Sequence, residues 1–170
     1  VTACGLAVTL AGCSGGSFSD VEESVLGTDD RGEVVGTYDR GIEQLDEGAE
    51  ARDDGIVAFN EERYDDSVDS LETAIERYTE AAETFRSAAE MAEDAGVPPA
   101  AGICTEAATH AGTMGESTVE ARAGAAAAGA GDPADVINDH VEASRELQAE
   151  AETSEVADPE TLLETLEASE

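Results

Sequence analysis

Lysine and tryptophan are absent from this chain of 170 residues, and its eight basic side chains are all arginine. Asp and Glu together number 41, so the formal net charge at pH 7 is −33. A protein that binds nucleic acid needs clustered basic side chains, which displace counterions from the phosphates. The composition therefore excludes nucleic acid as a partner.

Cysteine is also scarce, since only Cys4, Cys13 and Cys104 occur. The first two lie in a terminal segment that we expect to be processed, which leaves Cys104 alone in the body of the chain. A disulfide framework within one mature chain is therefore excluded. We expect Cys104 to be a small core residue, and a reactive thiol is the alternative.

Long apolar runs are missing, but a short one opens the chain. Residues 1–10 carry no charge, and this run is far shorter than the about 20 residues that a membrane span needs. Small residues follow it, then Cys13, then a Ser/Gly stretch at 14–17. The segment Leu10-Ala11-Gly12-Cys13 resembles the lipobox of secreted lipoproteins. A transmembrane anchor and a chance match are the alternatives.

The resemblance implies that Cys13 is the lipid attachment site and holds the mature protein at the outer face of the cell membrane. It divides the chain into three parts. Residues 1–12 are expected to be a signal peptide, incomplete at its N-terminus because it lacks a basic start and an initiating Met. Residues 13–32 are expected to be a lipidated, flexible, acidic tether, and residues 33–170 a helical bundle domain.

The charge balance carries a second resemblance. An acidic chain without lysine and rich in Ala and Gly is similar to proteins of extreme halophiles, among them those of haloarchaea. In molar salt the Debye length is about 3 Å, so the repulsion among carboxylates is screened. A disordered acidic tail is the alternative, but a hydrophobic fraction of 41% disfavours it.

Apolar residues in the body recur at steps of three and four, which predicts α-helices. Two such seams, over 33–59 and 64–95, flank a polar turn, and they hold five of the six aromatic residues. Folding the chain about this turn pairs large side chains across the two helices: Phe59 with Tyr64, Arg52 with Leu71, Leu45 with Tyr78 and Tyr38 with Phe85.

The second half predicts three more helices. Gly96 and the prolines after it end the second helix, and a third runs from about 100 to 130. Asp132 is expected to cap a fourth helix over 133–152, and Asp158 to cap a short last one. The expected fold is all-α, an antiparallel helical bundle of two long helical hairpins plus a short C-terminal helix.

Small residues recur every seventh position in both helices of the first hairpin. In the first helix they are Gly41, Gly48 and Gly55. Glycine costs about 1 kcal/mol against alanine inside a helix, so three in register indicate a role in packing. We expect small residues to face small ones and to bring the two backbones close together. A general richness in small residues is the alternative.

The residues around the first turn resemble a tetratricopeptide repeat at about 55–75. They are Gly55 and Ala58, then Tyr64, Ser67, Leu71 and Ala74. The resemblance implies binding of a protein or peptide. Against it, the second helix continues too far for a unit of 34 residues. An ordinary bundle of long helices explains the same residues, and we favour it.

Few residues carry the pattern of a catalytic or metal site. His110 and His140 are predicted to lie about 16 Å apart along the bundle, too far to share a metal ion. Neither a nucleophilic triad nor a phosphate-binding loop occurs, so we expect no enzyme activity, no cofactor and no metal. Arg52 is the one charged residue on an apolar seam. It either extends along Leu71 to a carboxylate such as Glu72, or fixes the register of the hairpin.

These observations predict a membrane-anchored, non-enzymatic cell-surface lipoprotein that serves as a structural or protein-interaction module. The alternative is an accessory lipoprotein that binds a ligand or a cation. An apolar groove between the hairpins would favour a partner. A polar pocket at His110 or His140 would favour a ligand.

Overall fold

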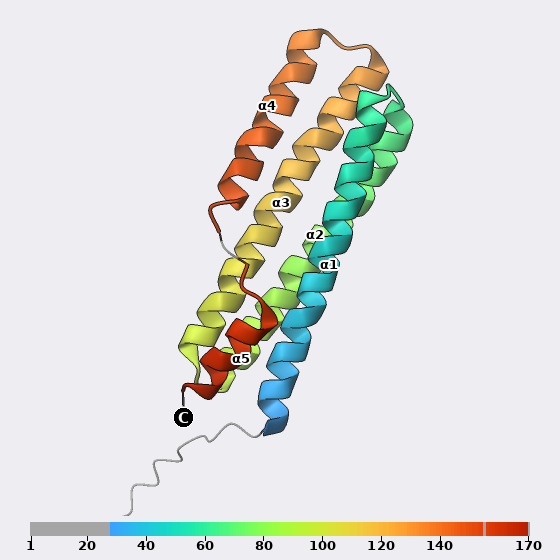
Figure 1. Ribbon diagram of the computed structural model, residues 1–170. Coiled ribbons are helices and arrows are strands. Elements are labelled where there is room, and N and C mark those ends of the chain that lie inside the picture. Colours follow the sequence, from blue (N-terminus) through green and yellow to red (C-terminus); the bar gives the residue numbers. More distant parts are fainter. Residues whose placement is uncertain (1–27, 155, 170) are drawn as a thin grey trace, which may run out of the picture.

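The computed structural model describes residues 28–154 and 156–169 and confirms the all-α fold (Figure 1). Within these residues it contains helices and no strand. In chain order the helices are α1 (Thr28–Asn60), α2 (Tyr64–Asp94), α3 (Pro98–Ala130), α4 (Ala134–Ala151) and α5 (Pro159–Glu167). Cys13 and the predicted signal peptide lie outside the described residues. α1 begins at Thr28, five residues before the expected start of the helical pattern, and the division of the chain at residue 33 stays a prediction.

The first four helices run alternately up and down, which confirms the two hairpins (Figure 1). Contacts across the first turn follow the predicted register. The ring centroids of Phe59 and Tyr64 lie 5.7 Å apart, and those of Tyr38 and Phe85 lie 5.0 Å apart. In these pairs the residue number on α1 falls as the residue number on α2 rises, as antiparallel helices require.

α3 is the central helix, and its neighbours explain the shape of the bundle. It packs against α2 on one side and α4 on the other, whereas among the described residues the backbone of α4 approaches no helix but α3. α4 therefore leaves much of its apolar face half-buried, including Ile137, Val141 and Leu147. The bundle is open between α1 and α4.

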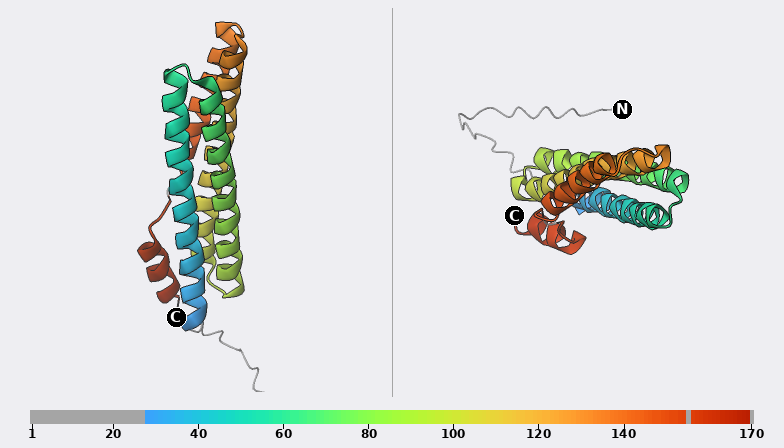
Figure 2. Two further views of the ribbon diagram at one scale, coloured as in Figure 1. Left: turned by 90° about the vertical axis from the view of Figure 1, so that its right-hand side faces the viewer. Right: turned by 90° about the horizontal axis from the view of Figure 1, so that it is seen from above.

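α5 covers α1 and α3 at the end of the bundle away from the turn between α1 and α2. It packs against α1 and α3 at the end of the bundle where α1 begins (Figure 2). Leu162 and Leu166 are fully buried there, in the main apolar core with Tyr38 and Phe85. Tyr38 Oη also donates a hydrogen bond of 2.8 Å to the carbonyl oxygen of Ala157, which ties α1 to the segment before α5.

The three long helices end in the same way. Gly96 and Gly131, which follow α2 and α3, adopt positive φ angles of 75° and 76°. Each amide after these glycines reaches back to a carbonyl five residues earlier, the hydrogen-bond pattern of a Schellman cap. The turn after α1 has the same bonds, with Glu62 at a φ of 61° in the place that glycine usually takes.

Of the two predicted helix caps, Asp132 for α4 and Asp158 for α5, only the second is confirmed. Asp158 accepts a hydrogen bond of 2.8 Å from the amide of Thr161, so it caps α5 as expected. This bond is the main reason that the pKa of Asp158 is lowered. Asp132 does not cap α4. Pro133 is the capping residue there, and no side chain accepts from the first turn.

The spaced glycines of α1 pack against large residues, so the expectation that small faces small is wrong. A Cβ atom placed on Gly41 would lie 2.6 Å from the ring of Phe85, and one on Gly48 would lie 2.9 Å from the ring of Tyr78. At Gly55 the nearest atom is Leu71 Cγ, at 2.6 Å. The glycines are therefore recesses in α1 that receive three large side chains of α2.

Gly41→Ala is expected to destabilise the protein, because its new methyl group would overlap Phe85. Overpacking of this kind costs about 1–3 kcal/mol, against about 1 kcal/mol gained in helix propensity. The matched control is Gly36→Ala on the same helix, where nothing lies within 4 Å of the added atom. It is expected to gain about 1 kcal/mol. Chemical unfolding followed by circular dichroism measures both, and equal stability of the two variants would contradict the packing.

Candidate functional site

The two histidines lie apart and each bonds to the facing helix. His110 Nδ1 donates to the carbonyl oxygen of Ala151 at 2.9 Å, and His140 Nδ1 donates to Oε2 of Glu120 at 2.8 Å. Ala151 is eleven residues from His140 along α4, which corresponds to about 16 Å. The predicted separation is confirmed, and the histidines do not form one site.

Cys104 is a core residue, as expected. Its side chain is fully buried on α3, in the apolar core with Tyr38 and Phe85. Burial raises the pKa of its thiol to about 11. The group therefore stays protonated near neutral pH, and the alternative of a reactive thiol is not favoured.

Arg52 is the residue whose surroundings differ most from expectation. Only 7% of it is exposed, yet it does not reach Glu72, which instead lies 3.6 Å from Arg122. Arg52 Nη2 donates a hydrogen bond of 2.9 Å to Oε1 of Gln148 on α4. Its Nε atom is buried and has no hydrogen-bond partner among the described residues. The register role remains a prediction.

A cavity of about 220 Å³ opens beside Arg52, in the gap between α1 and α4. Its position follows from the open seam, because α4 packs on α3 and leaves its inner face uncovered toward α1. Both apolar and polar side chains line it, and no carboxylate is among them: Arg52, Ile56, Phe59, Asn60, Leu71, Ala121, Val141, Ser144, Arg145 and Gln148.

Sequence reasoning found Arg52 but missed the α4 side of this cavity. Arg145 and Gln148 carry no motif, and both belong to a helix joined to α1 only through two intervening helices. The one usable signal was the charge of Arg52 on an otherwise apolar seam.

Tyr78 supplies a second buried polar group near Arg52. Its ring fills the recess at Gly48, and its hydroxyl is buried without a partner among the described residues. Burial raises the pKa of Tyr78 to about 12, and the nearby Arg52 guanidinium acts in the opposite direction. Two unpaired buried polar groups on neighbouring helices are a cost in stability, because each loses its bonds to water.

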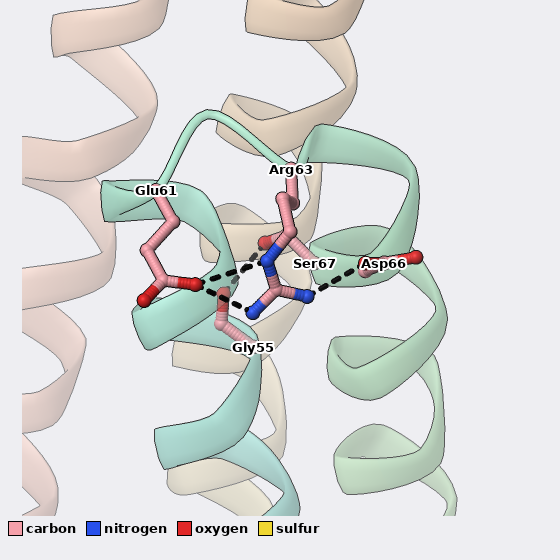
Figure 3. A network of polar contacts seen from close by, with 5 residues as sticks. All are labelled: Gly55, Glu61, Arg63, Asp66 and Ser67. Carbon is pink, nitrogen blue, oxygen red and sulfur yellow. Dashed lines mark hydrogen bonds and ion pairs between the residues drawn. The ribbon is translucent and has the colours of Figure 1, made fainter.

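The turn between α1 and α2 carries a polar network (Figure 3). Arg63 donates to Oε2 of Glu61 at 2.8 and 3.0 Å and to Oδ2 of Asp66 at 2.6 Å. These bonds, that to Asp66 first, raise the pKa of Arg63. Ser67 Oγ donates to the carbonyl oxygen of Gly55 at 2.8 Å, which joins the two helices inside the bundle.

Ser67 thus joins α2 to Gly55 of α1, and Tyr64 packs against Phe59 across the same turn. Gly55, Tyr64 and Ser67 are among the residues whose pattern resembles a tetratricopeptide repeat. The hairpin is nevertheless different from such a repeat, since α1 alone has 33 residues, nearly the length of a whole 34-residue unit. The long-helix bundle accounts for these residues.

Comparison of the chain with protein-family models, curated proteins and solved structures found no match. Among the described residues, none of the helices combines the length and the apolar character that crossing a membrane requires. The same residues contain no group of three or more His, Cys, Asp or Glu side chains placed to hold a metal ion. The cavity beside Arg52 is the best-defined candidate site.

Tyr78→Phe is expected to stabilise the protein by about 1 kcal/mol at pH 7, because it removes a buried hydroxyl that lacks a partner. The gain should grow at alkaline pH. The unfolded tyrosine ionises near 10.0 and the folded one near 12, so the parent loses stability as the pH rises through this window.

Urea unfolding at pH 7 and pH 11 measures the effect. Tyr38→Phe is the contrasting variant, since Tyr38 makes a hydrogen bond to Ala157, and it should lose stability at pH 7. A loss for Tyr78→Phe as large as that for Tyr38→Phe would show that the Tyr78 hydroxyl is satisfied.

Proposed function

We propose that this chain is a lipid-anchored, non-enzymatic module at the outer face of a cell membrane, and that its helical body binds a ligand or partner there. The observation that carries the anchor is the segment Leu10-Ala11-Gly12-Cys13 after a short apolar run. Lipid on Cys13 would hold the body at the surface, since two long acyl chains anchor a protein stably.

The open seam supports a binding role for the body. A closed four-helix bundle would bury the inner face of α4, whereas here the cavity leaves Ile56, Phe59 and Val141 accessible between the two hairpins. The site lies at neither histidine, so it differs from the pocket that sequence reasoning associated with a ligand.

The lining of the cavity favours the ligand-binding form of this function over protein interaction. The volume of about 220 Å³ is below the roughly 300–1,000 Å³ of pockets for drug-sized ligands, so it suits a smaller molecule and is too small for a partner helix. It also favours an anion over a cation, because two arginines and no carboxylate line it. Of the two alternatives given by the sequence, binding of a ligand or binding of a cation, the lining of the cavity favours the ligand.

Cys13→Ser is expected to move the protein from the membrane fraction to the soluble fraction, because the hydroxyl does not replace the thiolate as the lipid acceptor. The chain would be expressed with a Met and a basic segment before Val1, in a host that processes lipoproteins. Fractionation and mass spectrometry of the first peptide are the measurements.

The matched control is Cys4→Ser, which alters the predicted signal peptide and leaves Cys13 in place. It should remain in the membrane fraction with a lipid-modified Cys13. Recovery of Cys13→Ser in the membrane fraction would refute the anchor.

We further propose that the protein works in concentrated salt. The net charge of −33 supports this, as does the small number of cations available to offset it. At pH 7 the unfolding midpoint is expected to rise steeply between 0.1 M and 2 M KCl, as the Debye length falls from about 10 Å to below 3 Å.

The same titration near pH 4 is the control, since the sequence pI is about 4.1 and little net charge remains to be screened. The salt dependence should then be much weaker. A midpoint that does not change with salt at pH 7 would contradict the proposal.

A further inference from the structure

The cavity lined by residues of α1–α4 differs from the other surface hollows in its charged side chains. Asp and Glu make up 41 of 170 residues, yet none lines it. Three other surface hollows each include two or more acidic residues, among them Asp30, Asp65 and Asp69. The lining of the cavity thus carries two arginines and no carboxylate, on a strongly acidic protein.

Arg52 supplies the buried charge of this site. Arg52 as a whole is 7% exposed, and the hydrogen-bond partner of its guanidinium is the neutral amide of Gln148. Its Nε–H is buried and unpartnered among the described residues. A buried cation is normally paired with a carboxylate, because its lost hydration is otherwise not offset. The nearest candidate from the sequence, Glu72, pairs with Arg122 instead.

Arg145 adds a second guanidinium at the rim of the same cavity. It is exposed and forms no ion pair within the described part of the chain. By contrast Arg63, Arg77 and Arg122 each lie within 4.0 Å of a carboxylate. An anion in the cavity would therefore meet one buried and one exposed arginine, and planar guanidinium groups suit a carboxylate well.

The other wall of the cavity is apolar. Ile56, Phe59, Leu71, Ala121 and Val141 form it. The volume of about 220 Å³ exceeds the about 150 Å³ of an apolar cavity known to bind benzene. Space therefore remains for a short hydrocarbon chain or a single ring beside the arginines.

We propose that this cavity binds a small amphiphilic carboxylate, with the carboxylate on Arg52 and Arg145 and the hydrocarbon against Ile56, Phe59 and Val141. The proposal rests on the proposed function, in which the helical body binds a ligand, and it names the chemical class of that ligand. It does not depend on the lipid, because all the residues concerned lie in α1–α4.

The test is isothermal titration of the full-length Cys13→Ser chain with hexanoate, without detergent, in the KCl concentration at which the chain is most stable. Detergent is left out because its apolar tails would compete for the cavity. We expect a dissociation constant on the order of 1 mM, as befits so small a ligand. Hexanol and hexylammonium, which lack the carboxylate, should bind at least tenfold more weakly.

Variants assign the binding to the cavity. Arg52→Met is expected to lower the affinity for hexanoate at least tenfold. Arg145→Gln should lower it only about threefold, because Arg145 is exposed to solvent. The matched control is Arg86→Gln, since Arg86 is also exposed and without an ion pair among the described residues, and lies outside the cavity. It should bind hexanoate like the parent.

A fourth variant guards against loss of binding through misfolding. Ala121→Leu fills the cavity, keeps both arginines and should abolish binding while circular dichroism shows full helicity. Equal affinity of hexanoate and hexanol, or unchanged binding by Arg52→Met or Ala121→Leu, would overturn the proposal.

The two proposals fail separately. If hexanoate does not bind and Cys13→Ser is still lost from the membrane, the proposal of a carboxylate ligand is overturned and the proposal of a lipid anchor stands. If hexanoate binds and Cys13→Ser is retained in the membrane, the proposal of a lipid anchor is overturned and that of a carboxylate ligand stands.

Discussion

The insertion of α2 side chains into recesses of α1 determines the rest of the structure. Phe85, Tyr78 and Leu71 lie at seven-residue intervals and each occupies the space above a glycine. This contact sets the register of the first hairpin, and therefore the face of α2 that remains for α3. With α3 placed, α4 packs on it alone, and the seam toward α1 stays open. The cavity is a consequence of that sequence of contacts.

The two ends of the bundle differ in how their helices pack. Around Phe85, Cys104 and Leu162 the helices enclose an apolar core with small residues on every side. At the opposite end, Arg52 and Gln148 replace apolar contact between α1 and α4 with one hydrogen bond. A protein with so few basic residues places a buried one where it is not neutralised, and this arrangement makes sense if an external anion completes it.

Sequence reasoning succeeded where local rules decide the structure. Periodicity and the glycines after α2 and α3 predicted the helices, and a short turn fixed the pairing of Tyr38 with Phe85. It failed where distant helices meet. The partner of Arg52 lies on α4, 96 residues away, and no turn relates the two helices. The recesses at the glycines were also missed, because reflection about a turn gives the level of a residue but not the rotation of its side chain about the helix.

The length of α1 determines how far the cavity lies from the end of the bundle at which this helix begins. Arg52 lies 24 residues beyond the start of α1 at Thr28, which corresponds to about 35 Å along the helix axis. The tightly packed end of the bundle, with α5, is the end at which α1 begins (Figure 1). Cys13 precedes α1 in the sequence. Under the proposed lipid anchor, the length of α1 would therefore separate the cavity from the charges of the membrane by several Debye lengths, and the cavity would be exposed to solutes of the surrounding medium.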